Sequence, residues 1–183
     1  KRGGVNIFVA EDRDAAAYML NDFYALLGEQ HIYFFPTSYK KSILYGKEDP
    51  QGVVQRTDAL NAIRQHDKGY MVVCTYPEAL AEAVADRERM EQQSLRIAVG
   101  DKVAQTDLVE WLQQSGFVRV DFVYEPGQYS VRGGLVDVFS YVESRPYRID
   151  LFGDEVDSLR RFDISSQLSA ERPSAVEIIP NMM

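Results

Sequence analysis

The sequence predicts an α/β fold in two parts: a partial parallel-sheet layer, followed by a smaller α+β module whose sheet is mainly antiparallel. Strand-like apolar runs alternate with helical patterns up to about residue 90, which is typical of a parallel sheet. A charged connector without an apolar period follows at Asp86–Gln93. Beyond it, short strand-like runs are separated by tight turns that contain glycine. We therefore expect two domains, residues 1–90 and residues 91–183.

The first domain opens with a strand, a helix and a second strand. Val5–Ala10 is a short apolar run that predicts a buried strand, and Glu11-Asp12 follows it at the position of a helix N-cap. Apolar residues recur at three- and four-residue spacing through Arg13–Leu27, and Gly28 stands where a C-cap glycine would. The next apolar run, His31–Phe35, completes a βαβ unit, so the two strands should be parallel.

The remainder of the first domain continues this alternation. Thr37–Gly52 holds a proline, two glycines and several charges, which predicts a long surface loop. A helix is expected at Val53–Gln65, and a fully apolar strand at Tyr70–Thr75. Pro77 suits the first turn of a third helix, which should run from Glu78 to about Arg89.

The second domain has a different pattern. Leu95–Val99 predicts a strand, and Thr106 is expected to cap a short helix that Gly116 ends. Phe117–Tyr124 then reads as a further strand. The chain beyond it holds strand-like runs, with tight turns at Pro126-Gly127, Gly133-Gly134 and Gly153-Asp154 and a last strand at Val176–Ile179. An antiparallel sheet with one covering helix accounts for this order.

The most informative stretch lies between Ser130 and Asp163. Arg132-Gly133-Gly134 enters a short apolar strand, Leu135–Phe139, that only Asp137 interrupts. In the following run, Tyr147, Ile149 and Leu151 alternate with Arg148, Asp150 and Phe152, so a strand would place the first three on an apolar face and the others on the opposite face. A third run, Val156–Phe162, fits either a strand or a helix.

Two interpretations of the face with Arg148, Asp150 and Phe152 are open. It is either a solvated sheet face with weak surface ion pairs, or a recognition surface, because arginines and aromatic rings dominate binding energy at protein interfaces. The residues by themselves favour the solvated face. Arg132 is likewise open: its guanidinium either bonds carbonyl groups of its own turn or reaches a partner's carboxylate.

Charge and composition exclude several function classes. The formal net charge of −8 argues against an extended nucleic-acid grip, so direct DNA binding through Arg160-Arg161 and Lys40-Lys41 is a weak alternative. The single Cys74 cannot form an internal disulfide and suits a reducing cytoplasm, where we expect this protein. No apolar run is long enough to cross a membrane. A chain that starts at Lys1, without a methionine, is expected to be a fragment of something longer.

The sequence offers no convincing catalytic, metal or cofactor site. It has no GxxxxGK[ST] loop, and the turns at Glu11-Asp12 and Tyr76-Pro77 put acid or proline where a phosphate cradle needs N–H donors. His31 and His66 lie far apart, with no Cys or His at ligand spacing. The acids Asp154, Glu155 and Asp157 are typical of a solvated turn. We therefore expect no enzyme activity and no cofactor.

Two segments of the second domain carry a family resemblance. They are EPGQYSVRGGLVDVF, residues 125–139, and PYRIDLFGDEVDSLRRFD, residues 146–163. They resemble the signature of the module shared by the excision-repair protein UvrB and the bacterial transcription-repair coupling factors (Mfd). The resemblance spans Leu95–Pro180, and the first domain resembles the degenerate, helicase-like region that precedes this module. The short Thr37–Gly52 segment favours the coupling factors, because UvrB has a long tyrosine-rich hairpin there.

The resemblance implies a non-catalytic module that binds the damage-recognition ATPase UvrA and recruits excision repair to stalled RNA polymerase. It places the contact on Arg132, Arg148, Asp150 and Phe152, so Arg132→Ala or Arg148→Glu should weaken UvrA binding with the fold intact. The full-length protein would be an ATP-dependent DNA translocase that also engages RNA polymerase and DNA, with an autoinhibitory C-terminal domain over this surface. The alternatives are a fragment of the UvrB subunit and a nucleotide-binding ATPase domain.

Overall fold

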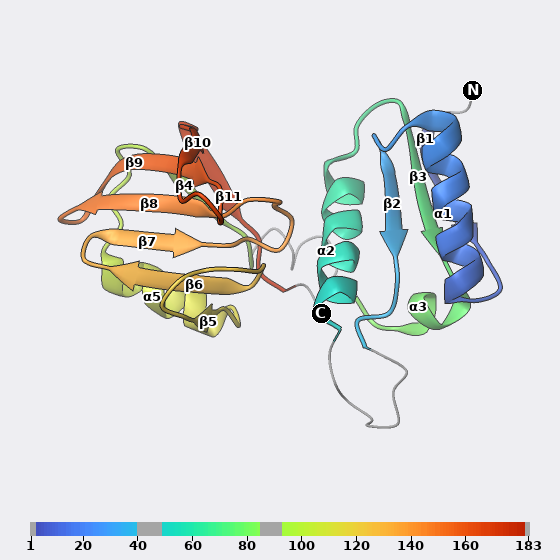
Figure 1. Ribbon diagram of the computed structural model, residues 1–183, viewed down its shortest axis with the longest axis horizontal. Coiled ribbons are helices and arrows are strands. Elements are labelled where there is room, and N and C mark those ends of the chain that lie inside the picture. The colour runs from blue at the N-terminus through green and yellow to red at the C-terminus, as the bar shows by residue number, and fades with distance from the viewer. Residues whose placement is uncertain (1–2, 40–48, 85–92, 182–183) are drawn as a thin grey trace. The chain divides into compact units, whose positions relative to one another are not determined.

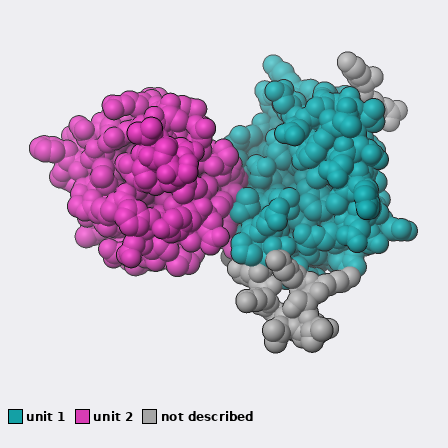
Figure 2. Space-filling view, in the orientation of Figure 1, with its two compact units in different colours: residues 1–87, 182–183 teal, residues 88–181 magenta. Residues whose placement is uncertain are grey.

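The computed structural model describes residues 3–39, 49–84 and 93–181 (Figure 1). The chain divides into two compact units, coloured separately in Figure 2. Unit 1 comprises residues 1–87 with 182–183, and unit 2 comprises residues 88–181. As expected, the fold is of the mixed α/β type, with a parallel sheet in unit 1 and a mainly antiparallel sheet in unit 2.

Unit 1 is built on a three-stranded parallel sheet with the order β1-β3-β2. The strands are β1 (Gly4–Val9), β2 (Ile32–Phe35) and β3 (Tyr70–Thr75), and both outer strands run parallel to β3. Helix α1 (Arg13–Leu27) follows β1, α2 (Pro50–Gln65) follows β2, and α3 (Pro77–Ala81) follows β3. This order confirms the expected alternation of parallel strands and helices.

Local chemistry explains where α1 begins and how it packs. The Asp12 carboxylate accepts a hydrogen bond from the Ala15 N–H at 2.8 Å, which caps the helix N-terminus. Gly28 ends the helix with a positive φ of 80°, a conformation that glycine adopts without strain. Between these caps Ala16 and Leu20, one turn apart, are the buried residues of the helix. They join the core that β2 and β3 form.

Two helices of unit 1 differ from their expected bounds. Helix α2 begins at Pro50, three residues before the expected start, because proline is well suited to the first helical position and Asp49 precedes it as the N-cap. Helix α3 ends at Ala81, and the backbone of Glu82 is already extended, so the helix expected to reach Arg89 is too long. The part of that prediction on residues 85–92 lies outside the described residues, as do residues 40–48 of the expected loop.

The single cysteine offers a reporter for unit 1. Cys74 lies in the central strand β3 with no exposed surface, and burial raises the pKa of its thiol to about 11 from 9.0. A raised thiol pKa leaves less of the reactive thiolate. We expect a thiol-reactive dye to label Cys74 only when unit 1 unfolds, so the labelling rate in mildly alkaline buffer should rise with denaturant. Rapid labelling of the native chain would contradict this placement.

Unit 2 holds a six-stranded sheet with the order β10-β9-β8-β7-β6-β5, and a two-stranded ribbon, β11-β4. All described pairs are antiparallel except β5 with β6. The strands are β4 (Leu95–Ala98), β5 (Val118–Arg119), β6 (Gln128–Arg132), β7 (Leu135–Val138), β8 (Tyr147–Phe152), β9 (Glu155–Phe162), β10 (Ser169–Glu171) and β11 (Ala175–Ile178). The run Val156–Phe162, whose sequence fits either a strand or a helix, forms the strand β9.

One helix, α5 (Gln105–Gln114), covers the core face of this sheet. Its Leu108 and Leu112 pack into one cluster with residues of β6, β7, β8 and β9, all buried. The helix N-cap is Ala104, so the expectation that Thr106 caps the helix is wrong. Leu108 and Leu112 are four residues apart, so they lie on the same face of the helix, the one that packs on the sheet.

The strand expected over Phe117–Tyr124 is wrong beyond its first residues. Only Val118–Arg119 is paired, as β5. The Gln128 side-chain oxygen accepts hydrogen bonds from the backbone N–H groups of Tyr124, at 2.8 Å, and Glu125, at 3.3 Å. A local turn thus uses donors that a longer strand would give to a neighbouring strand.

Candidate functional site

The strand register places the four expected contact residues on one face of the unit 2 sheet. Arg132 on β6 pairs with Leu135 on β7, which in turn pairs with Asp150 on β8. Residues paired across antiparallel strands share a face, as do residues two apart on one strand. Arg148 and Phe152 therefore lie on the same face as Asp150. The alternate residues of β8 point into the core, as the sequence predicts.

We call this face the outer face and define it by Arg132, Asp137, Arg148, Asp150 and Phe152. Asp137 belongs to it because it pairs with Arg148 on β8 and with Ser130 on β6, two residues before Arg132. The neighbouring residues of β7, Val136 and Val138, are fully buried on the core face. The outer face thus carries four charged side chains and one aromatic ring on three neighbouring strands.

Two glycines shape the turn beside the outer face. The β6–β7 hairpin turns through Gly133 and Gly134, since Arg132 pairs directly with Leu135. Gly133 has a positive φ of 58°, and a Cβ on Gly134 would lie 2.6 Å from the Leu151 carbonyl oxygen. The Leu151 N–H donates to the Gly134 carbonyl at 2.9 Å. This close approach of backbones holds the turn against the end of β8 that bears Phe152.

The carboxylate of Asp137 bridges the two arginines. Arg132 Nη2 donates to Oδ2 at 2.6 Å. Arg148 donates twice, from Nε to Oδ1 at 2.7 Å and from Nη2 to Oδ2 at 2.9 Å. Asp137 is only 2% exposed, so these are charge-assisted bonds away from bulk water. The hydrogen bonds to Asp137 are the main cause of a raised pKa for Arg148.

Each of these arginines also stacks on an aromatic ring. The Arg132 guanidinium lies 4.8 Å from the centre of the Phe122 ring, and that of Arg148 lies 4.2 Å from the Phe162 ring. Their exposure differs: 32% of the Arg132 side chain is accessible, against 12% for Arg148. Arg132 is therefore open to a partner, whereas Arg148 is largely enclosed.

Phe152 is the most exposed large apolar residue on the outer face. It ends β8, directly before the turn at Gly153-Asp154, and 83% of it is accessible. Asp150, two residues earlier, accepts a hydrogen bond from Arg160 Nη2 at 3.1 Å. Its carboxylate is therefore partly neutralised within the fold.

Of the four expected contact residues, the three charged ones are already paired within the fold. Both arginines already bond Asp137, and Asp150 already bonds Arg160. An exposed ring beside a paired guanidinium, rather than excess positive charge, distinguishes the outer face. Asp137 was missed as a site residue. Its position between Val136 and Val138 was the available signal, because strand alternation puts it on the face opposite the two valines.

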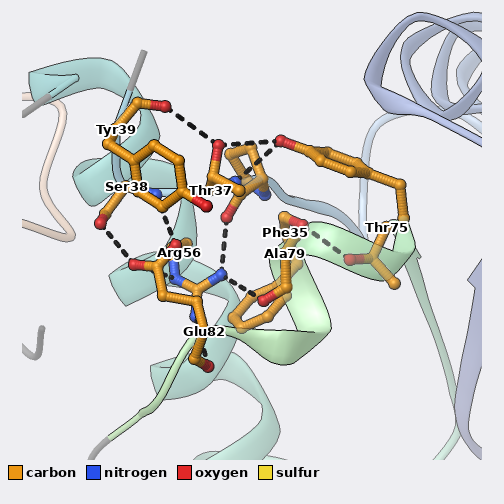
Figure 3. Close-up of polar contacts among 10 residues, drawn as sticks. Phe35, Thr37, Ser38, Tyr39, Arg56, Thr75, Ala79 and Glu82 are labelled. Carbon is orange, nitrogen blue, oxygen red and sulfur yellow. Dashed lines mark hydrogen bonds and ion pairs between the residues drawn. The ribbon is translucent and has the colours of Figure 1, made fainter. Parts of the chain in front are cut away.

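Unit 1 has a second polar centre, at the carboxyl ends of its parallel strands (Figure 3). The Arg56 side chain, fully buried, donates from Nη1 to the carbonyls of Pro36 and Ala79, both at 2.8 Å. Its guanidinium lies 4.0 Å from the centre of the Phe35 ring, and its Nε is 3.7 Å from the Glu82 carboxylate. Burial lowers the pKa of Arg56, an effect that the Glu82 charge opposes. Arg56 thus ties the loop that follows β2 to α3, the helix that follows β3.

A cavity of about 220 Å³ adjoins this centre, at the edge where α/β proteins commonly bind ligands. Asp12, Asp14 and Glu78 line it with one cation, Arg13, which is 3.4 Å from Asp49. The acidic side chains of this wall would repel a phosphate. The Asp12 carboxylate also accepts the hydrogen bond of the Ala15 N–H, one of the donors at the start of α1 that a phosphate would need.

Among residues 3–39, 49–84 and 93–181, no group of three or more His, Cys, Asp or Glu side chains is arranged to hold a metal ion. No helix of those residues is both long and apolar enough to pass through a membrane.

Comparison with known proteins identifies relatives. Residues 95–183 match the family model of the UvrB interaction domain. The chain is 28% identical over 165 residues to a transcription-repair-coupling factor of Bacillus subtilis, and 31% identical over 128 residues to that of Escherichia coli. These matches cover 90% and 70% of this chain, but only 14% and 11% of the two relatives. A Staphylococcus aureus factor is 27% identical over 157 residues, 86% of this chain and 13% of the relative. Residues 95–183 therefore belong to the UvrB interaction domain family, and the chain as a whole is similar to a segment of transcription-repair-coupling factors.

Proposed function

We propose that the outer face of unit 2 binds UvrA, and that the chain thereby recruits nucleotide excision repair to stalled RNA polymerase. The observation that carries the proposal is Phe152, a ring 83% exposed at the end of β8 in a UvrB interaction domain. Exposure of a phenyl ring to water is unfavourable in free energy, so its burial in an apolar pocket of a partner contributes directly to affinity.

Arg132 supplies the polar part of the proposed contact. Arg132 borders the turn that lies against the end of β8, and within the described residues only its Nη2 has a hydrogen bond. The other guanidinium donors can bond acceptors on UvrA. An exposed aromatic anchor beside a polar donor is the usual composition of an interface hot spot.

We further propose roles for other segments of the longer protein that the family resemblance implies. In a protein several times longer than this chain, other segments would translocate on DNA with ATP, engage RNA polymerase, and cover the outer face with a C-terminal domain until repair is needed. The chain itself acts as a binding module without catalysis. We place it in the cytoplasm, where its buried thiol would stay reduced.

Titration of the chain into UvrA tests the proposal. We expect Arg132→Ala to raise the Kd roughly tenfold, about 1.4 kcal/mol, because a partly exposed hot-spot guanidinium is lost while Arg148 still neutralises Asp137. Arg119→Ala is the matched control: Arg119 is exposed on β5 and pairs with Tyr129, whose side chain lies in the core on the opposite face. Equal affinities for the wild type and Arg132→Ala would remove Arg132 from the contact.

Arg148→Glu is not a clean test, contrary to the expectation from sequence. The Arg148 side chain is 12% exposed, and the new carboxylate would face the buried Asp137. Two like charges there, with Arg132 as a single counterion, would destabilise unit 2. A loss of UvrA binding would then not distinguish a lost contact from a damaged fold.

A further inference from the structure

The most constrained charged side chain of the outer face is also the least exposed one. Asp137 makes three charge-assisted hydrogen bonds to two arginines on the neighbouring strands β6 and β8. Its backbone is fixed in β7, between two fully buried valines of the core. A partner protein cannot reach a carboxylate that is 2% exposed, so its effect on binding must pass through the arginines.

We propose that Asp137 is a positioning residue, which holds the Arg132 guanidinium in the orientation that the partner recognises, with Arg148 as the second half of the clamp. The inference rests on the proposed binding of UvrA to the outer face. It divides the residues of the outer face by role: Arg132 and Phe152 touch the partner, whereas Asp137 and Arg148 hold Arg132 in place from behind.

The geometry separates the two arginines in this way. Arg148 gives two donors to Asp137 and a third bond to Gln167 Oε1 at 3.1 Å, and it is mostly enclosed. Arg132 gives a single donor to Asp137 and keeps about a third of its side chain accessible. Arg148 thus neutralises the buried Asp137 carboxylate, whereas the same carboxylate fixes the orientation of the Arg132 guanidinium.

Pre-organisation explains why such steering matters for affinity. A free arginine side chain samples many rotamers, and a partner must immobilise it at an entropic cost. The bond at 2.6 Å to Asp137 and the stacking on Phe122 restrict Arg132 before binding. Removal of the Asp137 charge should therefore weaken binding even though Asp137 itself touches nothing on the partner.

A double-mutant cycle on the complete chain tests the inference. UvrA affinity is measured for the wild type, Asp137→Asn, Arg132→Ala and the double variant. If Asp137 acts through Arg132, the roughly tenfold effect of Arg132→Ala should fall below about twofold in the Asp137→Asn background. Phe152→Ala should weaken binding by the same factor in both backgrounds, because Phe152 has no bond to Asp137.

A second variant guards against misfolding. Asp137→Leu combined with Arg148→Met removes both halves of the buried pair, a change that is often tolerated when the new side chains are apolar and similar in volume. Trp111 fluorescence, which reports unit 2, should show a folded protein, and the Kd for UvrA should rise about tenfold.

The outcomes separate the two proposals. If the wild-type chain does not bind UvrA, the proposed function fails. If it binds, and Arg132→Ala costs the same factor with and without the Asp137 charge, the positioning role is overturned and the contact remains. Wild-type affinity in the Asp137→Leu, Arg148→Met variant would overturn it as well.

Discussion

Arg56→Ala is expected to lower the free energy of unfolding of unit 1 by roughly 3–5 kcal/mol, the usual cost of removing one partner from a buried ionic contact. The substitution leaves the carbonyls of Pro36 and Ala79 without the guanidinium that each contacts at 2.8 Å. It also removes the cation next to Glu82 and the group stacked on Phe35. Because whole domains have only about 5–15 kcal/mol of stability, unit 1 should become marginal.

The chain contains its own reporters for this measurement. Cys74 labelling follows the unfolding of unit 1, and Trp111, the single tryptophan, follows unit 2. In Arg56→Ala, Cys74 should be labelled at much lower denaturant concentration, while the Trp111 transition stays in place. Arg64→Ala is the control on the same helix, and it should cost no more than about 0.5 kcal/mol, since Arg64 bonds the side chain of Asn61 one turn away. A similar loss for both variants would contradict the role given to Arg56.

Phe152→Ala should weaken UvrA binding by at least about 2 kcal/mol, roughly 30-fold in Kd. The ring is 83% exposed in the chain by itself, so its removal leaves no cavity in the core of unit 2. The stability of unit 2 should change by less than about 0.5 kcal/mol. A calorimetric titration paired with Trp111 fluorescence measures both quantities on one preparation.

Tyr18→Ala is the matched control for this variant. Tyr18 lies on α1 in unit 1 and is 74% exposed, so it tests whether any exposed aromatic ring contributes to binding. We expect its Kd to equal that of the wild type. Equal losses in the two variants would indicate nonspecific adhesion instead of a defined contact.

The sequence predicts the parts of this fold that depend on local patterns. Alternation along Tyr147–Phe152 is sufficient to assign the two faces of β8, because successive side chains of a strand point to opposite sides. The helix period between Arg13 and Leu27 and the glycine after it likewise predict α1 and its end.

The features that the sequence could not predict depend on which strands become neighbours. Asp137 accepts bonds from Arg132 on one side and Arg148 on the other only because β7 lies between β6 and β8 in register. Similarly, the apolar character of Phe117–Tyr124 suggested a strand, but a glutamine four residues further on takes the backbone donors. The sequence of a strand does not show whether its charged side chains will form ion pairs within the fold or stay available to a partner.

Hydrogen exchange on the wild-type chain, with and without UvrA, shows whether the outer face of unit 2 is the surface that binds UvrA. We expect UvrA to slow exchange in the two turns beside the outer face, at Gly133-Gly134 and Gly153-Asp154, where backbone amides border Arg132 and Phe152. Unchanged exchange at both turns in the presence of saturating UvrA, with protection confined to unit 1, would contradict it.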